Sequence, residues 1–274
     1  MIPSPFAYAR PDTLSEAVHL IQQEKAVVLS GGHSLMTDLK QRRVQPDLVV
    51  DINGLALTDV IIEPETISIE ALVRQNVLLS EDIANAIPML ADVASSAADP
   101  AIRARGTLVG ALCAAERQGD WAAAALVLDA QLHLTNAENV KKVADYGERL
   151  ASGQVCQKGE LATRVDLKRP RAGAAQGYRK VKHAAIGWSI ASLAFNISPG
   201  FARLAVSGAT SIPCRLEHVE QHLITGDGSL NDAIEADFER VTFEGDSYAS
   251  ASYRKKRLAV LVNRTIEEIS APAS

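Results

Sequence analysis

A glycine pair between a short strand and a helix is the feature that most limits what this chain can fold into. Residues 26–30 are apolar and partly β-branched, which predicts a strand, and Gly31-Gly32 follows at once. The next helix is predicted over 35–41, with Ser34 as its cap. Only glycine lets a chain turn this tightly without a Cβ clash, so several backbone N–H groups meet at one point. Such a concavity binds anions, above all phosphate.

The bare motif also has plainer interpretations. Its spacing matches neither the dinucleotide-binding Gly-x-Gly-x-x-Gly pattern nor the Walker A pattern. A glycine pair after a strand is more often an ordinary turn than a ligand site. His33 alone is more often a packed or exposed histidine, and Ser34 beside it predicts no hydrolase, because the chain has no Gly-x-Ser-x-Gly elbow.

Helices and strands alternate along the rest of the chain. Apolar spacing predicts a helix over 12–24, and Thr13 with Glu16 forms a capping box at its start. The further predicted elements are strands at 47–52, 60–62, 67–69, 131–135, 177–182, 190–197 and 203–209, and helices at 80–87, 89–97, 121–128 and 250–269. Pro64 separates the strands at 60–62 and 67–69, which predicts a hairpin. The basic, proline-bearing stretch 168–173 predicts a linker. We therefore predict three parts, 1–55, 56–167 and 168–274.

Composition excludes several classes of protein. The formal net charge is −5 and the basic residues are scattered, which argues against a nucleic-acid binder. Three cysteines, Cys113, Cys156 and Cys214, have no Cys-x-x-Cys spacing, so they are interpreted as small apolar side chains that hold neither a metal nor a disulfide framework. No apolar run reaches the roughly 20 residues of a membrane helix, and residues 1–10 do not resemble a signal peptide. The cytoplasm is the predicted compartment.

Five motifs in one order resemble the FAD-binding medium subunit of the molybdenum hydroxylases, the family of the carbon monoxide and xanthine dehydrogenases. They are Met1-Ile2-Pro3 with Phe6 and Tyr8, Ser30-Gly31-Gly32-His33-Ser34, Gly106-Thr107-Leu108-Val109-Gly110, Tyr178-Arg179-Lys180-Val181-Lys182, and Tyr253-Arg254-Lys255. The resemblance implies an α+β fold: a two-subdomain FAD-binding domain like that of vanillyl-alcohol oxidase (PCMH-like), followed by a smaller C-terminal α/β domain.

The resemblance also implies a set of cofactor-binding residues. Two glycine motifs clasp the FAD diphosphate: Ser30, Gly31, Gly32, His33, Ser34 and Leu35 form the first, and Gly106, Thr107, Leu108, Val109, Gly110 and Ala111 the second. Asp120 matches an aspartate that contacts the ribityl chain or the ring, and Leu161 an apolar residue near the ring. Arg179 or Lys180 matches a basic position close to the cofactor. No residue is predicted to be catalytic, and none to bind a metal.

Three stretches depart from the family pattern. Val109 and Ala111 stand where the family has glycine and asparagine, which predicts weaker FAD retention. Glu70 replaces a favoured glycine, and the stretch 185–188 lacks an expected aspartate. From the local sequence alone, Asp120 is more often a solvated helix cap, and Lys180 more often an exposed strand end.

The implied function is electron transfer by FAD within a larger complex. The flavin would pass electrons from [2Fe-2S] clusters of a small partner subunit to a quinone, oxygen or NAD. A large partner subunit would carry molybdopterin cytosine dinucleotide, and the complex would be a dimer of heterotrimers. Two alternatives stay open: a flavin-free scaffold subunit of such a complex, which the departures motivate, and an independent flavin oxidase, for which the chain shows no substrate pocket.

Overall fold

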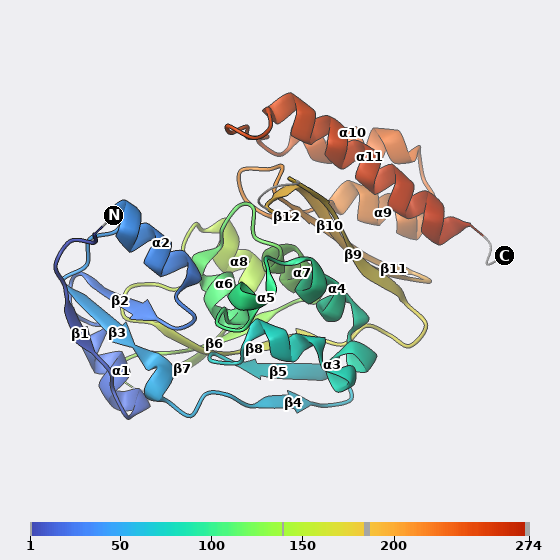
Figure 1. Ribbon diagram of the computed structural model, residues 1–274. Helices are drawn as coiled ribbons and strands as arrows, with labels where there is room; N and C mark the ends of the chain where they lie inside the picture. The colour runs from blue at the N-terminus through green and yellow to red at the C-terminus, as the bar shows by residue number, and fades with distance from the viewer. Residues whose placement is uncertain (1, 139, 184–186, 272–274) are drawn as a thin grey trace. The chain divides into compact units, whose positions relative to one another are not determined.

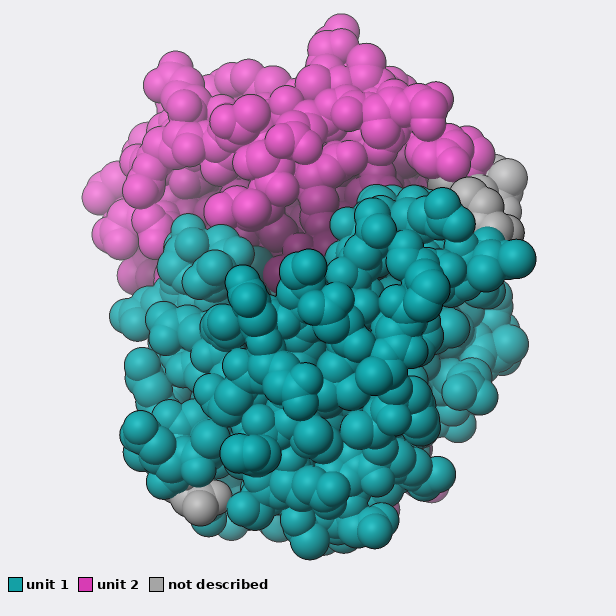
Figure 2. All heavy atoms as spheres, turned by 90° about the vertical axis from the view of Figure 1, so that its left-hand side faces the viewer, with its two compact units in different colours: residues 1–77, 99–114, 130–167 teal, residues 78–98, 115–129, 168–274 magenta. Residues whose placement is uncertain are grey.

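The computed structural model describes residues 2–138, 140–183 and 187–271, which form two compact units. The first unit contains residues 1–77, 99–114 and 130–167, and the second contains 78–98, 115–129 and 168–274 (Figure 2). The division of the sequence into 1–55, 56–167 and 168–274 stays a prediction.

The first unit begins with a small parallel sheet. Its strands, in spatial order, are β1 (Ala7–Ala9), β3 (Leu48–Asp51) and β2 (Ala26–Leu29). Helix α1 (Leu14–Leu20) starts at Thr13, whose hydroxyl accepts the Glu16 N–H at 3.2 Å as the capping box predicts. Helix α2 (His33–Gln41) follows the glycine pair, and its cap is Gly32. The prediction that Ser34 caps this helix is wrong, because Ser34 already lies within its first turn.

A five-stranded sheet completes the first unit (Figure 1). Its strands, in spatial order, are β4 (Val60–Ile62), β5 (Thr66–Glu70), β8 (Leu161–Lys168), β6 (Gln131–Thr135) and β7 (Lys141–Asp145). The predicted β4–β5 hairpin is confirmed as antiparallel. Glu70 has a local role in it, because its carboxylate accepts the N–H of Asp59 at 2.9 Å. The remaining helices of the unit are η1 (Ile52–Gly54), the start of η2 (Gln75–Leu79), α5 (Pro100–Arg103), α6 (Leu108–Ala114) and α8 (Tyr146–Ala151).

The second unit has a four-stranded antiparallel sheet between helices. In spatial order its strands are β12 (Cys214–Arg215), β11 (Phe201–Ser207), β10 (Ser189–Ser198) and β9 (Ala175–Lys182). Its helices are α3 (Glu81–Ala86), α4 (Pro88–Ser96), α7 (Trp121–Val127), α9 (Glu217–Thr225), α10 (Leu230–Glu239) and α11 (Ala251–Ser270). Apolar side chains of β10 and β11 pack with those of α9, α10 and α11 into one core. Helix α7 contacts the same two strands. Strand β10 is accordingly buried along most of its length rather than at alternate residues.

Arg254, in the last of the five sequence motifs, is a structural residue. It is 1% exposed, and its guanidinium donates to the carbonyls of Ser189, Ile190 and Gly208 at 2.8–3.0 Å and pairs with Asp246 at 2.6 Å. Because its charge and several of its donors are satisfied, this buried arginine ties helix α11 to the sheet. Within the described ranges, no helix combines the length and apolar character of a membrane span.

Candidate functional site

The first glycine loop leads from strand β2 into helix α2. Gly32 has a φ of +81°, a left-handed conformation that favours glycine. No side chain caps the helix, and its first turn contains no acidic residue. The first N–H groups of a helix have no partner within the helix. The start of α2 therefore offers backbone donors and the positive end of the helix dipole to an anion.

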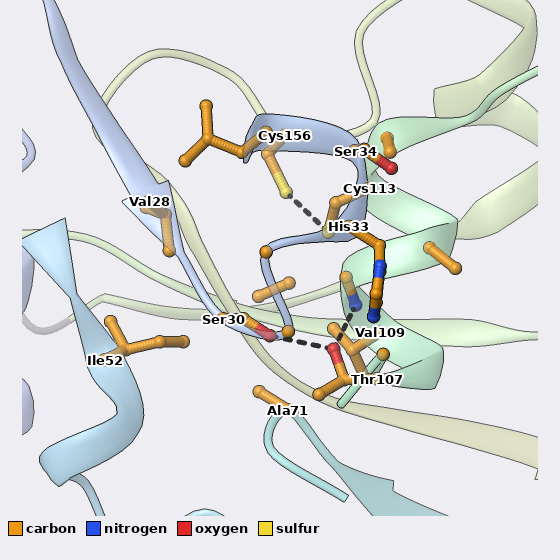
Figure 3. Close-up of a pocket in the computed structure, with 18 of the residues that line it drawn as sticks. Val28, Ser30, His33, Ser34, Ile52, Ala71, Thr107, Val109, Cys113 and Cys156 are labelled. Atoms are coloured by element: carbon orange, nitrogen blue, oxygen red, sulfur yellow. Dashed lines mark hydrogen bonds between the residues drawn. The ribbon is translucent and has the colours of Figure 1, made fainter. Parts of the chain in front are cut away.

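The second glycine loop leads into helix α6, and one hydroxyl links it to the first. The Thr107 Oγ1 accepts the Gly110 N–H at 3.1 Å, which caps α6 from within the loop. The same oxygen lies 2.8 Å from the Ser30 Oγ (Figure 3). The two loops are thus joined by a side-chain hydrogen bond between residues 77 positions apart.

The backbones of the two loops lie so close together that position 31 has no room for a side chain. A Cβ on Gly31 would lie 2.5 Å from the Arg105 carbonyl oxygen and 2.8 Å from the Gly106 Cα. These are backbone atoms, so no side-chain rotation could relieve the contact. The glycine is required for the close approach of the loops, beyond any need for a turn.

Asn53 and Arg74, which were not predicted from the sequence, form a polar brace that holds the backbones of both loops. The Asn53 amide donates to the Ser30 carbonyl at 2.9 Å, and the Asn53 carbonyl accepts from Arg74 at 2.5 Å. The other terminal nitrogen of Arg74 donates to the Arg105 carbonyl at 2.7 Å. Asn53 lies two positions after the carboxyl end of β3, in η1, and a polar residue just beyond a strand end was the signal available in the sequence.

A cavity of about 340 Å³ opens between the two loops, within the usual range of small-molecule sites. It is lined by most of the predicted residues: Ser30, Gly31, Gly32, His33, Ser34, Leu35, Gly106, Thr107, Val109, Gly110, Ala111 and Leu161. Leu108 is not in this lining; it is 2% exposed and packs in the core. Ten further lining residues were not predicted from the sequence: Val28, Asp38, Ile52, Ala71, Gln75, Cys113, Ala114, Cys156, Glu160 and Ala162.

Val109 lines the cavity without closing it. It is the second residue of α6 and is 2% exposed, so the helix turns most of its side chain into the protein (Figure 3). The open cavity beside it shows that a valine at this position does not fill the space. Of the other departures, Ala111 lies in the lining, whereas Ala185 and Ile186 lie outside the described residues.

The charges around the cavity suit a diphosphate. Its two acidic lining residues are each paired with an arginine: Asp38 with Arg43 at 2.6 Å, and Glu160 with Arg149 at 2.9 Å. The rest of the lining is mainly glycine, alanine, other apolar residues and hydroxyls. The residues present therefore fit a dinucleotide diphosphate held by backbone N–H groups. No group of three or more histidine, cysteine or acidic side chains in the described ranges could hold a metal ion.

Comparison with known proteins extends the match beyond this site. The family model for the FAD binding domain in molybdopterin dehydrogenase matches residues 4–169. The carbon monoxide dehydrogenase medium chain of Afipia carboxidovorans is 30% identical, with 100% of this chain and 99% of that chain aligned. The chain belongs to the FAD-binding medium subunits of the molybdenum hydroxylases.

Other relatives agree with this assignment. The glyceraldehyde dehydrogenase medium chain of Sulfolobus acidocaldarius is 28% identical, with 98% of this subunit and 100% of that chain aligned. The crystal structure of the Cu,Mo-CO dehydrogenase has a TM-score of 0.89 at 27% identity and covers 97% of this subunit and 98% of that chain. The resemblance, the α+β fold class and the assignment to a flavoprotein oxidoreductase subunit are confirmed.

The three other predicted residues lie in the second unit of the subunit, where two of them form a buried pair. The Lys180 Nζ lies 2.8 Å from the Asp120 Oδ1, and their side chains are 4% and 10% exposed. The Tyr178 hydroxyl donates to the same carboxylate at 2.6 Å. Asp120 begins helix α7, yet its side chain caps no N–H group, so its interpretation as a solvated cap is wrong. Lys180 is likewise not an exposed strand end.

Burial decides the electrostatics of this cluster. Desolvation raises the pKa of Asp120, and the charge and hydrogen bond of Lys180 oppose the shift only in part. Burial, with the neighbouring Asp120 charge, raises the pKa of Tyr178 well above its usual value. Arg179 takes no part in the cluster; it lies over the Phe195 ring at 5.7 Å and 3.9 Å from Glu268. Of the two basic candidates, Lys180 is therefore the one that meets Asp120.

Removing the hydroxyl that joins the glycine loops should loosen the site. We expect Thr107→Val to lower the free energy of unfolding by about 1–2 kcal/mol, because the Gly110 N–H loses its cap and Ser30 its partner. Urea denaturation measures the change. Thr107→Ser keeps the hydroxyl and should stay within about 0.5 kcal/mol of the wild type; equal losses in both variants would disprove the role of the hydroxyl.

Proposed function

We propose that this subunit binds one FAD with its diphosphate between the two glycine loops and passes electrons from [2Fe-2S] clusters of a small partner subunit to an external acceptor. The observation that carries the proposal is the open cavity onto which the starts of α2 and α6 face. The family assignment supports the same cofactor.

In this proposal the chain binds and orients the cofactor. The N–H groups at the start of α2, with the Ser34 hydroxyl, face one side of the diphosphate, and those at the start of α6 face the other. The Ser30–Thr107 bond and the Asn53–Arg74 brace hold both sides in place before FAD arrives. When bound, the isoalloxazine ring supplies the electron-transfer chemistry, which no side chain of this subunit has to perform. Contacts of Asp120, Leu161 and Lys180 or Arg179 with the ribityl chain or ring stay predictions.

The partners follow from the division of chemistry within the proposed complex. The relatives are named as medium chains, which supports a large molybdopterin-bearing subunit and a small [2Fe-2S] subunit, arranged as a dimer of heterotrimers. Molybdopterin cytosine dinucleotide would lie in the large subunit, where substrate is hydroxylated. Quinone, oxygen and NAD remain the candidate acceptors, and the cytoplasm the predicted compartment.

The proposal is tested by the colour and cofactor content of the purified complex. We expect flavin absorption bands at about 370 and 450 nm and about one FAD per medium subunit. Stopped-flow mixing with substrate should bleach the band near roughly 450 nm after the iron–sulfur clusters are reduced. A colourless native complex without FAD would instead support the scaffold alternative.

Restoring the family's asparagine should strengthen FAD binding. Ala111 lines the cavity, so the amide of Ala111→Asn can donate a hydrogen bond that the alanine cannot. A hydrogen bond to a charged group contributes about 1.5–3 kcal/mol, so we expect roughly a tenfold or greater increase in FAD affinity. Fluorescence titration of the FAD-depleted chain measures it. Ala111→Leu, which adds similar bulk without a donor, is the matched control, and an equal gain in both variants would contradict the argument.

A further inference from the structure

Two cysteines that are far apart in the sequence meet in the wall of the cavity. The Sγ atoms of Cys113 and Cys156 lie 3.4 Å apart (Figure 3). Both residues line the cavity and both are partly exposed, so small molecules in the cavity can reach them. The FAD-binding role assigns neither thiol a task.

The two thiols belong to separate pieces of the wall. Cys113 lies on α6, the helix that begins at the second glycine loop. Cys156 lies between α8 and β8, just before a turn in which the Glu160 N–H donates to the Gln157 carbonyl at 3.0 Å. A covalent bond between the sulfurs would tie helix α6 to this segment. The sulfurs would have to approach by about 1.4 Å to reach disulfide length.

The surroundings make the two thiols unequal. The hydrogen bond from Cys113, an N–H of Ala162 and the charge of Arg149 lower the pKa of Cys156 against the effect of burial and of Glu160. The same sulfur–sulfur contact, together with burial, raises the pKa of Cys113. The thiolate is the reactive form of cysteine, so Cys156 is the attacking sulfur and Cys113 the resolving one.

We propose that Cys113 and Cys156 are a redox-active dithiol that hydrogen peroxide converts to a disulfide in the cavity wall. The Cys156 thiolate attacks one peroxide oxygen; an S–O bond forms, the O–O bond breaks, and the released hydroxide takes a proton to leave as water. The Cys113 sulfur then attacks the sulfenic acid; the S–S bond forms, the S–O bond breaks, and the Cys113 proton leaves with the hydroxide as a second water. The two thiols together lose two electrons, and these reduce one hydrogen peroxide to two waters. An added dithiol reductant reverses the change by thiol–disulfide exchange.

The experiment counts thiols in the full chain before and after peroxide. Wild-type protein is treated with about one equivalent of hydrogen peroxide, unfolded in N-ethylmaleimide and weighed by intact mass spectrometry. We expect the maleimide adducts to fall from three to one, with a peptide that links Cys113 to Cys156, and to return to three after dithiothreitol. We expect the same count from FAD-depleted chain, so this test does not depend on the proposed function.

Cys214 provides the matched control. It lies in the second unit, and burial raises its pKa to about 11. Cys214→Ser should fall from two adducts to none, whereas Cys113→Ser should form no intramolecular disulfide and should leave a sulfenic acid on Cys156 that dimedone traps. Retention of all three thiols in the wild type, or a disulfide that maps to Cys214 or to a second molecule, would overturn the proposal.

Discussion

Gly31→Ala is expected to abolish useful FAD binding while leaving the chain folded. The new Cβ would lie 2.5 Å from the Arg105 carbonyl oxygen and 2.8 Å from the Gly106 Cα, so the two loops must move apart. Overpacking of this kind costs about 1–3 kcal/mol of stability. We expect a loss of about 100-fold or more in FAD affinity, equivalent to about 2.7 kcal/mol, because the donors of the two loops no longer face one diphosphate. Fluorescence titration and urea denaturation measure the two effects.

A glycine elsewhere in the same unit separates loss of the site from loss of stability. Gly153 has a φ of +76°, and a Cβ built on it meets nothing within 4 Å. Gly153→Ala should therefore lower the free energy of unfolding by about 1–2 kcal/mol through backbone strain alone, and the variant should keep its FAD affinity. If Gly31→Ala binds FAD as well as Gly153→Ala does, the close approach of the loops has no role in binding.

Lys180→Met is expected to destabilise the second unit strongly. It removes the cation 2.8 Å from Asp120 and leaves a buried carboxylate whose main partner is the Tyr178 hydroxyl. Breaking a buried pair in this way costs about 3–5 kcal/mol. Lys182→Met, on the same strand but with an exposed side chain, should change the free energy of unfolding by less than about 0.5 kcal/mol.

The pH dependence of the Lys180→Met variant has a definite sign. Burial already raises the folded-state pKa of Asp120, and the loss of Lys180 raises it further. A carboxyl group whose pKa is higher in the folded state lowers the free energy of unfolding most at pH values above that pKa, where it is ionised. This destabilisation disappears as the pH falls and the group takes up a proton. The destabilisation should thus be greater at pH 8 than at pH 5, as urea denaturation at both values would show. A constant difference, or no recovery when Asp120→Leu is added, would contradict the buried pair.

Local sequence was sufficient for the elements whose signals are local. The Thr13 capping box, the glycine pair after β2, the β4–β5 hairpin and the amphipathic stripe of α11 were all predicted correctly, within a few residues at their ends. Each depends on periodicity or on turn chemistry within about ten residues. Helix α2 starts earlier than predicted because the left-handed Gly32, rather than a serine hydroxyl, forms its cap.

What depends on distant contacts could not be predicted. Lys180 was interpreted as an exposed strand end, because both partners of its buried ammonium are distant in the sequence: Asp120 lies 60 positions away and the Ser96 carbonyl 84 positions away. Cys113 and Cys156 were interpreted as isolated apolar residues because their 43-residue separation carries no motif. The direction of the Val109 side chain could not be predicted for a related reason, since the phase of helix α6 decides it, and the weaker FAD retention expected from this residue stays a prediction.

The most direct test of the central claim is an experimental structure of the subunit determined with FAD. We expect density for the diphosphate between the starts of α2 and α6, within hydrogen-bond distance of backbone N–H groups both in the Gly31-Gly32 loop and at the start of α6. A diphosphate bound elsewhere on the chain, with this cavity empty at saturating FAD, would contradict it.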